Sequence, residues 1–238
     1  MHVDILAIGA HPDDVEISAS GTLLKHISLG HSAAIVDLTK GELGTRGNAE
    51  LRLKEADAAS AILGIKERVN LGMADGFFMN DKEHQLRIIE VIRYYKPKIV
   101  LANAVKDRHA DHGKASKLIS DACFYSGLRK IETKYKGEKQ TAHRPQAVYH
   151  YIQDRYIKPD IIVDISGFID KKMDSIKAFK SQFFDPNSNE PNTPISSKGF
   201  LQSIENRSAE YGRVIGVEYG EPFTVERCAG IDDLLLLK

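Results

Sequence analysis

Apolar and polar positions alternate along this chain in a way that predicts strands and helices in turn. Residues 3–9 and 33–38 are short apolar runs rich in branched side chains, which is typical of buried strands. Between them, residues 21–30 have the periodicity of a helix that ends at Gly30. The same alternation predicts a helix at 49–64, a strand at 68–72, a helix at 83–95 and a strand at 98–104. Strands separated by helices favour an α/β fold, in which helices cover both faces of a mostly parallel sheet.

The second half of the chain contains two stretches that break this pattern. Residues 129–146 follow a predicted helix at 112–128 and are rich in lysine and arginine, which predicts an exposed, flexible excursion. Residues 185–198 hold three prolines among polar residues, which predicts a flexible flap near a site. The other expected elements are strands at 147–152 and 160–165, a helix at 167–183 capped by Ser166, and a helix at 199–216. We expect a single domain over residues 1–238.

Composition narrows the class of protein. The 238 residues are 42% hydrophobic, and 33 basic residues balance 33 acidic ones, so no global field attracts nucleic acid or an anionic membrane. No apolar run approaches the ~20 residues of a membrane span, and the first residues lack a signal-peptide pattern. The two cysteines lack CxxC spacing, which suits a reducing compartment. We therefore expect a cytoplasmic protein with neither nucleic acid nor membrane as a partner. The leucine-rich end, 232–238, is expected to pack against the body or a neighbouring subunit.

Two histidine-containing loops follow predicted strands at the same edge of the expected sheet. AHPDD places His11 and Asp14 three residues apart, and HADH places His109 and His112 three apart. Loops at the carboxyl ends of parallel strands meet, so one carboxylate and two imidazoles from them can share a cation. Such a set with an open position for water is typical of catalytic zinc, and Fe²⁺ accepts the same ligands.

Neighbouring residues supply the other parts of a hydrolytic site. With Asp14 on the metal, Asp13 is free to act as general base toward a metal-bound water. Of His109 and His112, one would bind the metal, and the other would stabilise an oxyanion or protonate a leaving group. Asp111 lies between them and is placed to orient an imidazole.

A third loop on this edge, within residues 41–56, offers Arg46 and Arg52 to an anionic or hydroxylated substrate. A simpler interpretation is a surface ion pair between Arg52 and Glu55 on one helix. Each histidine motif also has a simpler interpretation, since HPDD suits a turn and HADH suits a solvated helix start.

Two other classes of protein fit the metal ligands less well. A non-catalytic metal-binding or nucleotide-binding α/β module would use four protein ligands and leave no open position. A metal-dependent phosphoesterase would usually need a second metal and more carboxylates than these loops supply. The three-ligand set beside an unpaired Asp13 favours a hydrolase.

Three segments together resemble the LmbE-like, or PIG-L-type, family of zinc-dependent N-deacetylases: AHPDD at 10–14, GELGTRGNAE at 41–50 and HADHGKAS at 109–116. The resemblance spans most of the chain and implies a Rossmann-like fold. It implies that the zinc ligands are His11, Asp14 and His112. It further implies that Asp13 is the general base, that a protonated His109 assists the transition state, and that Asp111 tunes a neighbouring histidine.

The resemblance also bears on the substrate. FYSGLRK at 124–130 and SQFFDP at 181–186 are similar to the bacillithiol-pathway branch, which implies hydrolysis of N-acetylglucosaminyl-L-malate to glucosaminyl-L-malate and acetate. The expected substrate-binding residues are Arg52, Arg46 and Glu42, with arginine suited to the malate carboxylates. The alternatives are deacetylation of another N-acetylglucosamine derivative and hydrolysis of a thiol-conjugate amide. Close relatives form homohexamers, so a homo-oligomer is expected.

Overall fold

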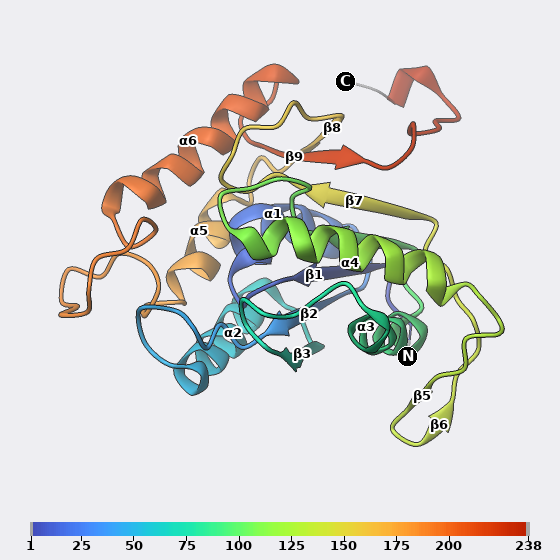
Figure 1. The fold of residues 1–238 in the computed structure, drawn as a ribbon. Helices are drawn as coiled ribbons and strands as arrows, with labels where there is room; N and C mark the ends of the chain where they lie inside the picture. The colour runs from blue at the N-terminus through green and yellow to red at the C-terminus, as the bar shows by residue number, and fades with distance from the viewer. Residues whose placement is uncertain (1, 237–238) are drawn as a thin grey trace.

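The computed structural model describes residues 2–236 and, within them, one seven-stranded sheet with helices on both faces (Figure 1). The strands lie in the order β3-β2-β1-β4-β7-β9-β8. Their bounds are β1 Ile5–Gly9, β2 Ala33–Thr39, β3 Arg68–Met73, β4 Ile99–Ala102, β7 Ala147–Tyr151, β8 Ile161–Asp164 and β9 Gly220–Val225. The pairings from β3 to β7 are parallel, and β9 runs antiparallel to both of its neighbours. The predicted α/β fold with a mostly parallel sheet is confirmed.

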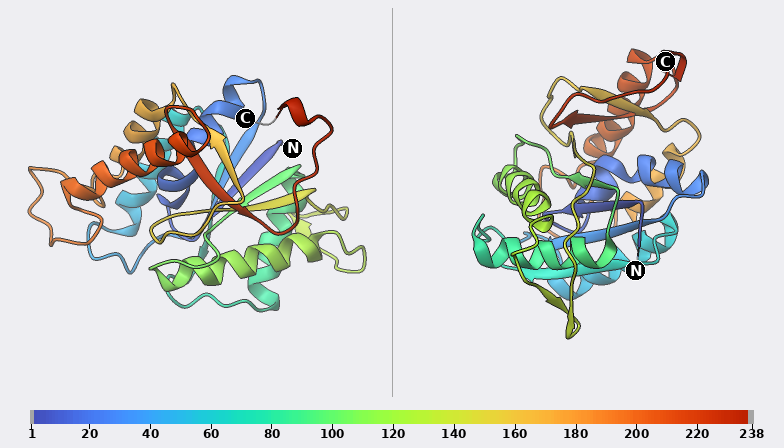
Figure 2. Two further views of the ribbon diagram at one scale, coloured as in Figure 1. Left: turned by 90° about the horizontal axis from the view of Figure 1, so that it is seen from above. Right: turned by 90° about the vertical axis from the view of Figure 1, so that its right-hand side faces the viewer.

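The helices cover the two faces in separate groups (Figure 2). The bounds are α1 Asp14–Ser28, α2 Ala49–Leu63 and α5 Ile169–Lys177 on one face, α3 Lys82–Tyr95 and α4 Ala110–Ser126 on the other, and α6 Lys198–Val214 against β8 and β9. In β1, Ile5 and Ala7 pack with the apolar side chains of α1, whereas Leu6 and Ile8 pack with those of α3 and α4. Successive strand side chains point to opposite faces, so a strand covered on both faces is buried throughout, as β1 is.

The strand order opens a crevice at one end of β1. The chain moves outward from β1 through β2 to β3 and then crosses to β4, on the other side of β1. In such sheets, ligands bind beyond the carboxyl ends of the strands where the connections diverge. The segments that follow β1 and β4, residues 10–13 and 103–109, leave the sheet at this point.

Helix α1 begins at Asp14, well before the predicted start at Gly21. Its first turns bury polar side chains, among them Glu16, Ser18 and Ser20. Polar residues on a buried face hide the apolar periodicity from which a helix is predicted. Asp14 therefore belongs to a helix start and not to a free loop.

The end of the chain differs from the prediction in two ways. Helix α5 is shorter than the predicted 167–183, and Ser166 does not cap it, because the Ser166 hydroxyl accepts the backbone N–H groups of Glu218 and Tyr219. These residues lead into β9, which the apolar pattern does not predict. Pro222 lies within that short strand, and proline normally argues against one.

The lysine-rich stretch 129–146 contains a short hairpin, β5 Lys134–Tyr135 and β6 Glu138–Lys139. Arg93 of α3 holds its start by donating hydrogen bonds to the carbonyl oxygens of Leu128 and Ile131 and to Thr133 Oγ1. The other predicted irregular stretch has no helix or strand before α6 begins at Lys198.

The leucine-rich end does not pack against the body where it can be described. Leu234 and Leu235 are 79% and 90% exposed, so packing against this chain is wrong for them, and contact with a neighbouring subunit stays a prediction. The last two residues, 237–238, lie outside the described residues. Among residues 2–236, no helix combines the length and apolar character needed to cross a bilayer.

Candidate active site

A cleft of about 320 Å³ lies beyond the carboxyl ends of the parallel strands. Its lining includes six predicted site residues: His11, Asp13, Asp14, Arg52, His109 and His112. Residues 193–195 of the predicted flap, together with Phe200 and Arg207 of α6, form another part of the wall. Segments far apart in the sequence therefore meet at this edge of the sheet.

Asp14 lies between the two histidine loops. Its Oδ1 is 3.1 Å from Nε2 of His112, and its Oδ2 is 3.6 Å from Nδ1 of His11. The side-chain amides of Asn103 and Gln153 donate to the same carboxylate at 3.0 and 2.9 Å and fix its orientation. The three predicted ligands are thus close to one another and face one cleft.

The ring nitrogens that point away from Asp14 are bound to other carboxylates. Nε2 of His11 lies 3.0 Å from Asp75 and 3.3 Å from Asp111, and Nδ1 of His112 lies 2.5 Å from Asp107. Metal-binding histidines almost always use their second nitrogen in this way, because the contact fixes the tautomer and the ring. Both histidines therefore have the surroundings of metal ligands.

A divalent ion suits the chemistry of this cluster. Potential ligand atoms of His11, His109 and His112 lie within 4.8 Å of one another, as do those of His11, Asp75 and Asp111. Asp14 contributes an oxygen beside two of these histidines. Buried carboxylates outnumber the imidazoles around the cluster, and buried charge requires neutralisation. Imidazole and carboxylate ligands with room for water are those of a catalytic zinc site.

The pKa values reflect the same balance of charge. Burial alone would lower the pKa of His112, but Asp14 and Asp107 raise it to about 9. Burial would raise the pKa of the Asp14 carboxyl, but the two histidines hold it well below its usual range. Protons on the imidazoles thus balance the carboxylates, and a bound metal ion would replace those protons.

Asp13 has a strained backbone and a buried side chain. Its φ is 117°, in the left-handed region that costs a residue other than glycine about 1–3 kcal/mol. Arg52 holds this turn, since Nη2 donates to Asp13 at 2.8 Å and Nε donates to the carbonyl oxygen of Pro12 at 3.0 Å. Burial raises the pKa of Asp13 to about 7, although the charge of Arg52 opposes the shift. The alternative pairing of Arg52 with Glu55 is wrong, because Glu55 accepts hydrogen bonds from Ser181.

His109 caps helix α4 and lines the cleft. Its Nδ1 accepts the backbone N–H of Asp111 at 3.2 Å, and burial lowers its pKa. An imidazole that accepts at Nδ1 carries its proton on Nε2 and is neutral. The structure thus favours a neutral His109 over the protonated form expected from the resemblance.

Two of the expected substrate-binding residues are outside the described cleft lining. Arg46 donates to the carbonyl oxygen of Phe183 and, at 2.6 Å, to Ser188 Oγ in the predicted flap. Glu42 accepts the backbone N–H of Asp75 at 2.9 Å. Both side chains hold loops around the cleft in this conformation.

Sequence reasoning missed three residues of this site. Asp75 follows β3 and Gln153 follows β7, so the argument from the carboxyl ends of parallel strands could have found both. Asp107 lies outside the histidine motifs, and its contact with His112 depends on the fold. Two backbone N–H groups, of Asp154 and Arg155, hold the other oxygen of Asp107.

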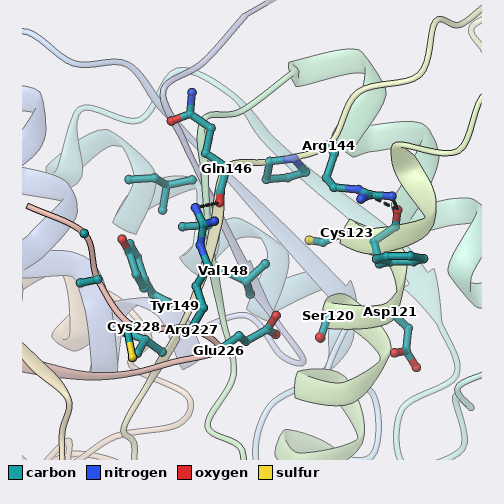
Figure 3. A pocket seen from close by; sticks show the side chains of 17 residues that line it. Ser120, Asp121, Cys123, Arg144, Gln146, Val148, Tyr149, Glu226, Arg227 and Cys228 are labelled. Carbon is teal, nitrogen blue, oxygen red and sulfur yellow. Dashed lines mark hydrogen bonds between the residues drawn. The ribbon is translucent and has the colours of Figure 1, made fainter.

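A larger cavity of about 590 Å³ lies between α4, β7 and the segment after β9 (Figure 3). None of the predicted site residues is in its described lining. Its arginines already have partners, since Arg144 donates to the carbonyl oxygen of Phe124 and Arg227 donates to that of Gln146. The candidate chemistry belongs to the smaller cleft.

Comparison with known proteins agrees with this arrangement. The family model described as PIG-L, GlcNAc-PI de-N-acetylase, matches residues 6–123. The conserved protein TT1542 from Thermus thermophilus has 33% identity and a TM-score of 0.85, covering 97% of this chain and 98% of that one. Diacetylchitobiose deacetylase from Thermococcus kodakarensis is 31% identical over 75% of this chain and 70% of its own length.

Two relatives of lower identity are named for other activities. A 4-oxalmesaconate hydratase from Pseudomonas putida is 28% identical over 74% of this chain and 73% of its own length. A probable N-acetyl-alpha-D-glucosaminyl L-malate deacetylase 2 from Bacillus anthracis is 25% identical over 75% of this chain and 81% of its own length. The family match, the long alignment at 31% identity and the shared fold lead to one conclusion. This chain belongs to the PIG-L family of de-N-acetylases.

Proposed function

We propose that this chain hydrolyses the N-acetyl group of a 2-acetamido sugar conjugate, and that its preferred substrate is N-acetylglucosaminyl-L-malate. The observation that carries the proposal is the meeting of His11, Asp14 and His112 in an open cleft, beside an Asp13 that is outside the ligand set. The hydrolysis releases acetate and the glucosamine-type amine.

The residues present fit a metal ion. His11, Asp14 and His112 would hold Zn²⁺, with Fe²⁺ as the alternative, and Asp75, Asp111 and Asp107 would orient the two imidazoles. When bound, such an ion supplies a Lewis acid for the amide oxygen and lowers the pKa of a coordinated water.

Asp13 and His109, which lie beside the ligands, have different roles in the hydrolysis. Asp13 takes the proton of the attacking water as the new carbon–oxygen bond forms, and Arg52 keeps its carboxylate directed into the cleft. The Nε2–H group of His109 donates a hydrogen bond to the developing oxyanion. Asp13 then delivers the proton to the amide nitrogen as the carbon–nitrogen bond breaks, so the amine leaves neutral.

The malate conjugate is proposed because residues 124–130 and 181–186 resemble the bacillithiol-pathway branch. The relative from Bacillus anthracis supports this choice. Neutral acetamido sugars are the main rival, because the better-matching relative is named a diacetylchitobiose deacetylase. A thiol-conjugate amide is the remaining alternative within the family.

Measuring acetate release tests the deacetylation reaction and the substrate preference together. The zinc-loaded chain should release acetate faster from N-acetylglucosaminyl-malate than from diacetylchitobiose or N-acetylglucosamine. Asp13→Asn should keep its zinc and lose at least about a hundredfold in turnover, since general base catalysis contributes roughly 10²- to 10⁴-fold. A variant that keeps both zinc and near-normal turnover would exclude Asp13 as the base.

Metal content tests the ligand set separately. His11→Ala, Asp14→Ala and His112→Ala should bind little zinc, whereas His109→Ala should keep zinc and lose rate. Asp75→Asn should weaken zinc binding by only about 10- to 100-fold, the range for a residue that orients a ligand. Full zinc binding by Asp14→Ala would exclude Asp14 as a ligand and shift the metal site to one of the two clusters that lack it.

A further inference from the structure

Three arginine side chains line the cleft, and they differ in how many of their donors are already used. Each of the three nitrogens of Arg52 has a protein acceptor: Nε donates to Pro12, Nη1 to Gly41 and Nη2 to Asp13. The sequence-based expectation that Arg52 holds a substrate carboxylate therefore meets a guanidinium in which every nitrogen already donates to the protein. Its geometry serves Asp13 instead.

Arg108 is also committed to a partner. Its Nε donates to the Asp154 carboxylate at 2.8 Å, and its side chain is 43% exposed. An exposed pair of this kind contributes little to binding, because water screens both charges.

Arg207 of α6 is the exception among the described arginines of the cleft. Within residues 2–236, protein acceptors are found for its Nη1 alone, and they are the carbonyl oxygens of Gln153 and Asp154. Nε and Nη2 have no described acceptor and are absent from the buried polar atoms that lack a partner, so they are accessible on a residue that lines the cleft. On a guanidinium, the N–H groups of Nε and Nη2 form the two-pronged edge that donates to both oxygens of a carboxylate.

The surroundings of Arg207 favour an anion. The nearest carboxylates already have partners, because Asp154 binds Arg108 and Asp107 binds His112. Phe200 lies about two turns before Arg207 on α6. It lines the same wall with residues 194–195 and adds apolar surface. A half-buried guanidinium with a free edge is less hydrated than a surface one, so it gains more from a bound carboxylate.

We infer that Arg207 is the residue that selects for a carboxylate on the substituent of the acetamido sugar, through its free Nε and Nη2 edge. This inference rests on the proposed function and names the chemistry of the substrate at that site: an acetamido sugar with an anionic aglycone, rather than a neutral oligosaccharide. It also moves the expected anion contact from Arg52 to a helix that the three sequence motifs do not include.

Paired substrates test the inference. The zinc-loaded enzyme and Arg207→Gln are compared on N-acetylglucosaminyl-malate and on methyl N-acetylglucosaminide, which differ in the anionic group. The variant should lose roughly 10- to 150-fold in kcat/KM on the malate conjugate, mostly through KM, because hydrogen bonds between charged groups are worth this factor. On the neutral glycoside, the change should stay within about threefold. Arg207→Lys should be intermediate, since a lysine offers a charge without the fork.

Controls separate this role from a structural one. Arg213→Gln is the matched variant, because Arg213 is an exposed arginine of the same helix outside the described cleft lining, and it should change the two substrates by the same small factor. Arg207 also contacts the backbone of Gln153, which holds Asp14, so zinc content and thermal unfolding are measured for each variant. Equal losses on both substrates, or selective loss in Arg213→Gln, would overturn the inference. If Arg207→Gln does not fold, a Lys variant that keeps the full preference for the malate conjugate would overturn it. If the wild-type chain releases acetate from neither substrate, the proposed function itself fails.

Discussion

Replacing Lys172 by methionine removes one half of an ion pair that is buried inside the protein. The Lys172 and Glu221 side chains are 1% and 2% exposed, and Nζ lies 2.7 Å from the Glu221 carboxylate. Nζ also donates to the carbonyl oxygen of Ile17 at 2.7 Å, and Glu221 accepts the backbone N–H groups of Gly21 and Thr22 at 2.9 and 2.6 Å. The pair therefore joins α5 and β9 to the middle of α1.

The magnitude follows from what the substitution leaves behind. Methionine fills much of the volume of lysine, so the main loss is the uncompensated charge on Glu221. Removing one partner of a buried pair costs about 3–5 kcal/mol of unfolding free energy. For a chain of this length, 1 kcal/mol shifts Tm by roughly 2–4 °C, so a decrease of at least about 6 °C is expected. Burial lowers the pKa of Lys172, and the charge of Glu221 opposes that shift.

Urea unfolding followed by circular dichroism measures this loss. Lys171→Met is the matched control, because Lys171 is the preceding residue of the same helix and is exposed, and it should change stability by less than about 0.5 kcal/mol. Adding Glu221→Gln to the Lys172 variant should recover part of the loss, since the amide is neutral and its oxygen can still accept one of the two N–H groups of α1. Equal stability of the two methionine variants would refute the reasoning.

Two further predictions concern the loop beside the base and the thiols. Gly41→Ala and Gly64→Ala both place alanine at positive φ and should each cost about 1–2 kcal/mol of stability. Of the two new Cβ atoms, only the one at position 41 would collide with Arg52. Only Gly41→Ala should therefore lose at least tenfold in deacetylation rate. Equal activity of the two variants would argue against the role of Arg52 in holding Asp13. In a thiol titration with DTNB, the exposed Cys228 should react in the native protein, whereas the buried Cys123, whose pKa is raised by burial, should react only after unfolding. Two fast thiols in the native protein would contradict this assignment.

The pattern of residues predicted the parts of this protein whose signal is local. Helix α2 runs from Ala49 to Leu63 and ends at Gly64 in the left-handed conformation, close to the predicted 49–64, because apolar spacing and a glycine cap act within a few residues. The edge at which the histidine motifs meet was also predictable, since parallel strands bring the loops after their carboxyl ends together. The start of α1 and strand β9 were not predicted. The first buries polar residues and the second contains a proline, so neither has the local pattern from which an element is recognised.

By itself, then, the sequence determined a parallel α/β sheet, the two histidine loops at one edge of it, and an aspartate beside the expected ligands. Only the tertiary structure decided which charged side chains became partners. Lys172 is buried with Glu221 while Lys171 is exposed, and Arg52 reaches Asp13 instead of Glu55. The physical reason is that hydrophobic periodicity acts between near neighbours along the chain. The partner of a buried charge is instead set by distances of a few ångströms between elements that are remote in sequence.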